Sequence, residues 1–356
     1  IVKSIIENAG DRKASTRTPK SGTIGVVANQ ATRFIAAHLK AATVVRILDG
    51  GKDDGPLWNY LIRTANKRGD KETSMKGTAT EAASKILAPF FKSGRMGGKG
   101  KMFNSVNESL NREEKLVIAL NMGNEGNTQR MLDGYGWTLE QVIPILESMT
   151  TEELNAVQEI WDLFGTYKDE ISAKSRRIYG KDLDFVEPTP IQIRSASGDV
   201  VSLRGGYYPA KYDSMASLAA ENYNEAEKAK DLLRAAHISA TTSRGYSKQR
   251  AAQVVERPLI RNLSALYAGL NEVIHDLSWH EWTIDANKLM RDKTFDKEIR
   301  ERYGPAFKNQ LKSWIKDVAA GEKGMDTDVD IALNFLRQGI SSAGLGFNLQ
   351  SAVLQV

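Results

Sequence analysis

Apolar residues recur at intervals of three and four along most of this 356-residue chain. That spacing places them on one face of an α-helix, so it restricts the chain to folds in which helices pack face to face. It predicts helices over 24–48, 151–179, 258–282, 295–303 and 305–320. Because these helices occupy so much of the length, we expect a mainly α protein.

Local signals mark where further helices begin. Asn111 is followed three residues later by Glu114, a pairing that caps the N-terminus of a helix. Pro56 follows Asp53-Asp54-Gly55, and Pro is favoured in the first turn of a helix. The sequence therefore predicts helix starts near these two positions, and a separate helix over 81–90.

One stretch departs from the helical repeat. Residues 191–195 and 200–204 alternate in polarity, and Ser-Gly-Asp at 197–199 supplies a turn between them. Such a pattern is typical of a β-hairpin. We therefore predict a mainly α fold: an elongated multi-helix bundle with one small β-hairpin insertion near residues 190–208.

Changes in the pattern divide the chain into regions. The predicted regions are an N-terminal helical region (1–109) with a basic loop (92–101), a central helical region (110–187), a β-hairpin and Tyr-rich segment (188–213) and a C-terminal helical region (214–356). The chain begins with Ile rather than Met and ends in a helical pattern, so we expect a segment of a longer protein.

Cysteine is absent, which excludes disulfides, thiol nucleophiles and thiolate zinc sites. The net charge is +5, because 49 basic residues face 44 acidic ones. This mild excess permits contact with nucleic acid or anionic lipid without requiring it. The basic segments Lys92–Lys101 and Arg244–Arg250 are candidates for phosphate contact, but we favour the interpretation that both are solvated surface loops.

The four histidines give a weak metal signal. Glu272 and His275 are three residues apart, and Asp276 and His280 are four apart, so either pair could share a helix face. A di-iron bundle needs a second Glu-x-x-His unit, which the sequence lacks. We expect these residues to make hydrogen bonds between helices, and we predict no metal and no cofactor.

Catalytic signals are equally weak. Glu125 lies in an Asn- and Gly-rich turn and could act as an acid in sugar chemistry, with Asp133 as a second carboxylate. The turn itself also explains the Asn and Gly residues. We therefore assign no catalytic residue and expect a protein that is not an enzyme.

Aromatic and basic residues alternate in Gly205–Tyr212, which is flanked by Arg204 and includes Lys211. Such interleaving can bind single-stranded nucleic acid by stacking and charge neutralisation. The alternative is that the tyrosine rings pin the hairpin to the helices. We favour the second interpretation.

The start of the sequence shows no secretory leader pattern. No window of the sequence reaches the apolar length of a membrane span. Residues 331–356 come closest to a membrane span, because no charged residue follows Arg337. Their small residues would allow close helix approach. We interpret this stretch as a buried bundle helix, with contact to a membrane as the alternative.

Three strings carry a resemblance: Leu116–Arg130, Arg204–Asp213 and Asn271–His280. In that order and spacing they resemble a region of the large polyvalent proteins and internal virion (DNA ejection) proteins of tailed phages and prophages. The resemblance covers about Leu110 to Val356 and supplies no catalytic residue.

The resemblance implies a structural segment that assembles in the virion or host envelope and assists genome delivery. Its partners would be other copies of itself and other virion proteins, with DNA and the host membrane as further candidates and no small-molecule substrate. Its location would be the virion, then the host cell envelope or cytoplasm after ejection. The alternatives are an enzyme domain acting on cell wall or nucleic acid, and a DNA-binding module.

Overall fold

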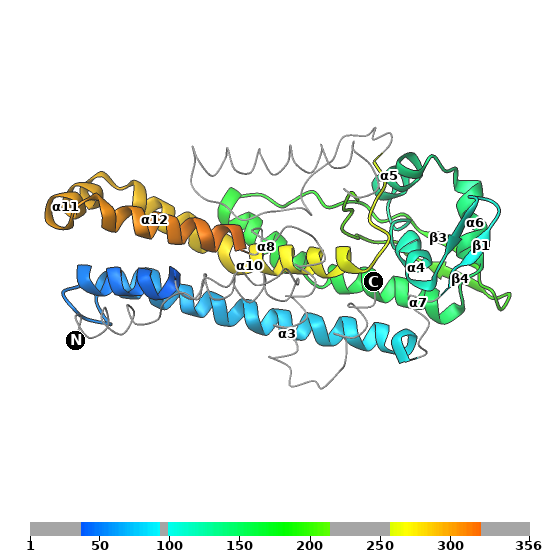
Figure 1. Ribbon diagram of the computed structural model, residues 1–356, viewed down its shortest axis with the longest axis horizontal. Coiled ribbons are helices and arrows are strands. Elements are labelled where there is room, and N and C mark those ends of the chain that lie inside the picture. Colours follow the sequence, from blue (N-terminus) through cyan, green and yellow to red (C-terminus); the bar gives the residue numbers. More distant parts are fainter. Residues whose placement is uncertain (1–36, 93–98, 214–256, 322–356) are drawn as a thin grey trace, which may run out of the picture.

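A computed structural model describes residues 37–92, 99–213 and 257–321 (Figure 1). The described part is mainly helical, as predicted. Its helices are one over 37–48, the π-helix η1 (Trp58–Ile62), α3 (Arg63–Lys92), α4 (Arg112–Leu120), α5 (Glu125–Tyr135), α6 (Leu139–Glu147), α7 (Thr151–Gly165), α8 (Lys168–Tyr179), α10 (Ser264–Arg291), α11 (Lys293–Tyr303) and α12 (Pro305–Ala320).

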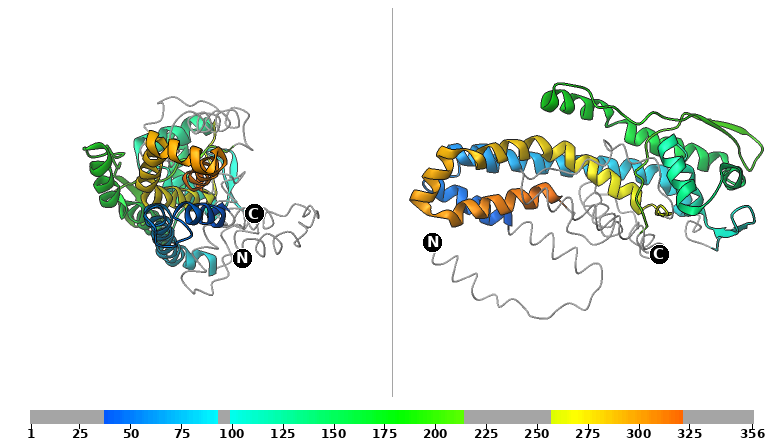
Figure 2. Two further views of the ribbon diagram at one scale, coloured as in Figure 1. Left: turned by 90° about the vertical axis from the view of Figure 1, so that its left-hand side faces the viewer. Right: turned by 90° about the horizontal axis from the view of Figure 1, so that it is seen from above.

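The body is elongated, with α3 and α10 lying side by side along its long axis (Figures 1 and 2). The shorter helices α4–α7 gather with the strands at one end, and α11 forms the opposite end. We call these the compact end and the rod end. Helix α8 packs on α10 between them.

Helix η1 continues directly into α3, so the two helices expected over 56–90 are one. The predicted gap reflected the lack of large apolar residues in the first half of α3. In that half Ala65 is buried, and in the second half Ala79 and Ala83 are buried as well. Alanine favours the helix and lets a neighbouring helix approach closely.

The single helix predicted over 151–179 is wrong, because two turn residues separate α7 from α8. The hydroxyl of Thr166 donates to the carbonyl of Leu163 at 2.7 Å and closes the last turn of α7. Helix α8 then begins at Lys168. The apolar spacing carries across this break, which is why the sequence did not reveal it.

The predicted hairpin is confirmed as strands β3 (Ile191–Arg194) and β4 (Val200–Leu203), which pair antiparallel. A second hairpin, β1 (Lys101–Phe103) with β2 (Glu108–Leu110), was not expected. Its strands are three residues long, too short to show an alternating pattern.

Buried apolar side chains form two separate cores. The compact-end core includes Leu120 of α4, Trp161 of α7 and Leu277 of α10. The rod-end core includes Trp282 of α10 and Trp314 of α12, whose rings meet edge to face with centroids 5.2 Å apart. Helices α3 and α10 contribute to both cores.

Several predicted features lie outside the described residues. They are the helix start over 24–36, most of the basic loop (93–98), the segment Arg244–Arg250 and the C-terminal stretch 331–356. Within the described part, no helix is both long enough and apolar enough to cross a membrane.

Candidate functional site

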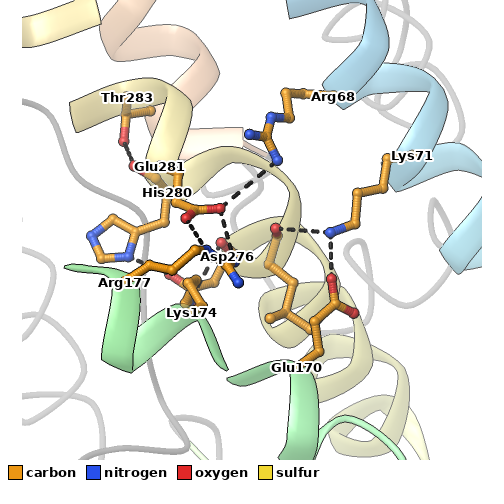
Figure 3. Close-up of polar contacts among 10 residues, drawn as sticks. Arg68, Lys71, Glu170, Lys174, Arg177, Asp276, His280, Glu281 and Thr283 are labelled. Atoms are coloured by element: carbon orange, nitrogen blue, oxygen red, sulfur yellow. Dashed lines mark hydrogen bonds and ion pairs between the residues drawn. The ribbon is translucent and has the colours of Figure 1, made fainter. Parts of the chain in front are cut away.

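Polar side chains of α3, α8 and α10 meet where one hydrophobic core gives way to the other (Figure 3). On α10 the change of core falls between Leu277 and Trp279. We call this set the polar layer. Its members are Arg68, Lys71, Glu72, Lys76, Glu170, Lys174, Arg177, His275, Asp276, His280 and Glu281.

The centre of the polar layer is a buried trio. The Lys174 ammonium of α8 contacts Oδ2 of Asp276 on α10, and Nδ1 of His280 lies 3.6 Å from Oδ1 of the same carboxylate. The exposed fractions of these side chains are 4% for Lys174, 0% for Asp276 and 3% for His280. An ion pair so far from water is strongly coupled, because little solvent screens it.

Two partly exposed ion pairs flank this trio (Figure 3). On one side Lys71 of α3 contacts Glu170 of α8. On the other, Arg177 donates two hydrogen bonds to Glu281, at 2.7 and 3.1 Å. The hydrogen bond from Arg177 lowers the pKa of Glu281. The flanking pairs join all three helices, and their side chains are more exposed than those of the trio.

A second carboxylate, that of Glu72 on α3, is partly buried against α10 and contacts His275 and Trp279, which neighbour Asp276 and His280 in sequence. Its Oε1 is 3.0 Å from Nδ1 of His275 and 3.2 Å from the Lys76 ammonium, and Nε1 of Trp279 donates to its Oε2 at 2.6 Å. Burial alone would raise the pKa of Glu72. The opposing charges and hydrogen bonds overcome that effect and hold its pKa well below the ordinary value of 4.5.

The histidine pairs predicted from spacing are therefore only partly formed. Asp276 and His280 do share one face of α10, together with Lys174. Glu272 and His275 do not share a partner, because Glu272 contacts Lys211 and His275 approaches Glu72. Among the described residues, no three imidazole or carboxylate groups lie close enough to hold one metal ion.

Two of the strings that carry the resemblance meet at the compact end. The turn 121–124 and the first residues of α5 (125–127) contact the extended segment 205–212, and Gly206 N donates to Gly123 O at 2.8 Å. A Cβ on Gly123 would lie 2.4 Å from the ring of Trp161. Only glycine allows the backbone to approach the indole this closely.

Two asparagines complete this contact. The Asn124 side chain caps α5 and also donates to Gly206 O at 3.1 Å. The buried Asn127 side chain donates to Tyr208 O at 2.8 Å. The Asn and Gly residues of the turn thus have structural partners in the same chain.

The third string, Asn271–His280, lies on α10 and contacts the segment 205–212 as well. Lys211 contacts Glu272, and a Cβ on Gly269 would lie 2.3 Å from the Pro209 ring. We call the meeting of 121–127, 205–212 and this part of α10 the central junction. Its hydrogen bonds join segments that are about 80 residues apart in the chain.

The tyrosines of the second string pack inside the protein. Tyr207 and Tyr208 meet the ring of Phe164 edge-on, and Tyr208 and Tyr212 are buried. Arg204 forms an ion pair with Asp162 at 2.7 Å. These contacts favour the interpretation that the rings pin the hairpin to the helices.

The predicted carboxylate pair is not brought together. Glu125 is an exposed residue in the first turn of α5, and Asp133 accepts a hydrogen bond from Gln129 at 2.7 Å. Eight positions along one helix separate the two by about 12 Å. That exceeds the spacing that sugar hydrolysis by paired carboxylates requires.

The rod end carries an open apolar pocket of about 530 Å³. At the edge of this pocket, the charged side chains of Arg302 and Glu298 form an ion pair at 2.9 Å. The Tyr60 hydroxyl donates to Asp285 O at 3.1 Å. Its lining residues are Leu48, Asp49, Pro56, Leu57, Tyr60, Leu289, Phe295, Glu298, Ile299, Arg302 and Tyr303.

Sequence reasoning missed Glu72 and Lys174, the partners that α3 and α8 bring to α10. Glu72 is 203 residues from His275, and Lys174 is 102 residues from Asp276. The spacing of residues along one helix gives no information about which residues of another helix they contact. Comparisons of the chain with protein families, curated proteins and solved structures gave no match.

Proposed function

We propose that the chain is a structural segment of an internal virion protein of a tailed phage. In this role it assembles with copies of itself and with other virion proteins, and it assists delivery of the genome across the host envelope. The proposal rests on the resemblance of three strings in the sequence and on what those strings do in the fold.

The observation that carries the proposal is the central junction. The strings that resemble phage ejection proteins contact one another through Gly123, Gly206 and Lys211. Residues used in this way maintain a shape. A shape-maintaining module at one end of an elongated body suits an assembly subunit.

The helices also suit a chain that must unfold and refold during ejection. Helices α4–α8 are 9 to 15 residues long, and three of them begin with capping boxes. Such local structure forms quickly, and a chain without cysteine cannot be trapped by wrong disulfides.

The test is to measure the chain in purified phage particles before and after DNA release. We expect a fixed number of copies per particle, and loss of the chain from the particle together with the DNA, while the shell protein stays behind. Finding the chain in infected cells but never in washed particles would contradict the proposal.

The enzyme alternative has its own test. If the chain hydrolyses cell wall or nucleic acid, Glu125→Gln or His275→Gln should abolish that activity while leaving the folded protein intact. Under the structural proposal neither substitution changes any hydrolysis. Zymography of the full chain and both variants separates the two cases.

A further inference from the structure

The two ends of the elongated body carry opposite charge. Residues 131–167, which include α6 and α7 at the compact end, contain seven acidic residues and no basic one (Figure 1). Residues 288–316, which include α11 and most of α12, contain nine basic and four acidic residues, a net charge of +5. The acidic end of one copy therefore attracts the basic end of another.

The other described parts of the two ends do not cancel this difference. Residues 99–130 and 191–204, which complete the compact end, together contain seven basic and five acidic residues. Residues 37–62, which contribute to the rod end, contain three of each kind. The body is thus charged in opposite senses along its long axis.

Helix α6 exposes an apolar pair at the acidic end. Leu139 and Ile143 are four positions apart, so they lie on one face of the helix, and their exposed fractions are 51% and 42%. Glu140 and Glu147 belong to the same exposed face, and neither forms an ion pair with a described residue. The opposite face of α6 is buried in the compact-end core through Val142, Ile145 and Leu146. A helix that is apolar on two faces has a second surface to cover.

The rod-end pocket is the complementary surface. Its volume of about 530 Å³ lies in the range of sites that enclose small apolar groups. Tyr60 and Tyr303 line it and remain 44% and 37% exposed. Apolar side chains four residues apart on a helix are the anchors that such a pocket binds. The apolar part of its lining is supplied by Leu48, Pro56, Leu57, Leu289, Phe295 and Ile299.

We propose that copies of this chain associate head to tail, with α6 of one copy seated in the rod-end pocket of the next. Leu139 and Ile143 enter the pocket, while the acidic compact end faces the basic rod end. The inference rests on the proposed function, because it names the surfaces through which the assembling copies meet. Two different surfaces on opposite ends leave one of each free, so the contact repeats and builds a ring or a filament.

A second copy fits these surfaces better than another partner does. Nucleic acid or anionic lipid would match only the basic rod end and would leave Leu139 and Ile143 exposed. One helix face in one pocket is smaller than the interface of a stable dimer. We therefore expect each contact to be weak and to depend on protein concentration.

The first test is sedimentation of the purified full chain over a range of concentrations at low and high salt. We expect oligomers larger than dimers that grow with concentration and dissociate as salt screens the opposite charges. Leu139→Asp should weaken the association more than about tenfold, because the carboxylate would lose its water in the pocket.

The matched control is Leu39→Asp. Leu39 is 61% exposed and belongs to neither surface, so this variant should associate as the wild type does. A wild-type chain that stays monomeric at millimolar concentration would overturn the proposal. Equal weakening by Leu39→Asp and Leu139→Asp would also overturn it, because α6 would then have no special part.

A mixing experiment tests the head-to-tail arrangement. Tyr303→Glu puts a charge in the pocket and leaves α6 intact, whereas Leu139→Asp leaves the pocket intact. Each variant alone should be monomeric, and an equal mixture should form dimers and nothing larger, since one competent contact remains. The dimer would also show that both variants fold. Self-association of either variant alone, or a monomeric mixture of two variants with wild-type thermal unfolding, would overturn the arrangement.

The outcome is separable from that of the particle experiment. A chain that is present in particles but monomeric in sedimentation would overturn the head-to-tail contact alone. A chain that is absent from particles would overturn the proposed function, and sedimentation would still decide whether α6 binds the pocket.

Discussion

The two ends of the molecule are stabilised in different ways. At the compact end, short helices with clear caps surround a core that also receives a hairpin and the central junction. At the rod end, long helices pack through three tryptophans, Trp279, Trp282 and Trp314. Local signals therefore determine much of the first region, and contacts between distant residues determine the second.

The polar layer lies between these two regions and contains the most buried charges in the described part of α10. Polar groups inside a helical core often fix the register of the helices, because a shifted register would leave charges unpaired. The comparison indicates that Glu72 aligns α3 with α10 and that the Lys174–Asp276 pair aligns α8 with α10. Apolar packing on either side supplies most of the buried area.

The largest expected effect comes from breaking the polar layer. Lys174→Met leaves the Asp276 carboxylate buried without its amine, which should lower the free energy of unfolding by about 3–5 kcal/mol. Lys71→Met removes the half-exposed counterpart and should cost less than about 1 kcal/mol. Urea unfolding of the full chain measures both, and equal small losses would contradict the role of the inner pair.

A second effect should depend on pH. The folded state holds the pKa of Glu72 below its ordinary value, so the carboxylate stabilises the fold above about pH 4.5 and that contribution is lost as the pH falls. Glu72→Gln should cost about 2–3 kcal/mol at neutral pH, the range for hydrogen bonds to a charged group.

The check is a series of unfolding curves from pH 7 to about pH 3. The difference between wild type and Glu72→Gln should shrink as the pH falls below the ordinary carboxyl value. A difference that stays constant across the series would show that the Glu72 charge contributes nothing to the alignment of α3 and α10.

A smaller effect sharpens the description of the compact end. Gly123→Ala forces a methyl group against Trp161, where overpacking should cost about 1–3 kcal/mol. The matched control is Gly126→Ala, because a Cβ there first meets the flexible end of Arg130 at 3.4 Å. Thermal unfolding should separate the two variants, with Gly126→Ala at or slightly above wild type.

The smallest effect is expected at the surface of the compact end. Arg204→Gln breaks an ion pair with Asp162 in which both side chains are more than half exposed. Solvent screens such pairs, so the loss should be below about 1 kcal/mol and should vanish at high salt. A larger, salt-independent loss would place Arg204 in a buried role that its exposure contradicts.

Sequence reasoning predicted the elements that local chemistry determines. The cap at Asn111, the hairpin over 191–203 and the helices α11 and α12 agree with the structure. It failed where tertiary packing overrides the pattern. Helix α3 is continuous through a stretch that is poor in large apolar residues, and α7 ends although the apolar spacing continues.

The candidate site was less predictable than the fold. The spacing of Asp276 and His280 correctly placed both on one face of α10, but their partner Lys174 comes from α8. Glu272 and Lys211 could be paired only once the chain path was known. The periodicity of a single sequence does not show which residues of different helices are in contact.

Hydrogen exchange of the full chain tests the central claim most directly. If the central junction is a packed structural unit, the hydrogen-bonded amides of 121–127, 205–212 and 271–280 should exchange together, with the free energy of global unfolding. If 205–212 is instead a mobile ligand-reading loop, its amides, including the Gly206 amide bonded to Gly123 O, should exchange far earlier than those of α10. That second result would contradict the account.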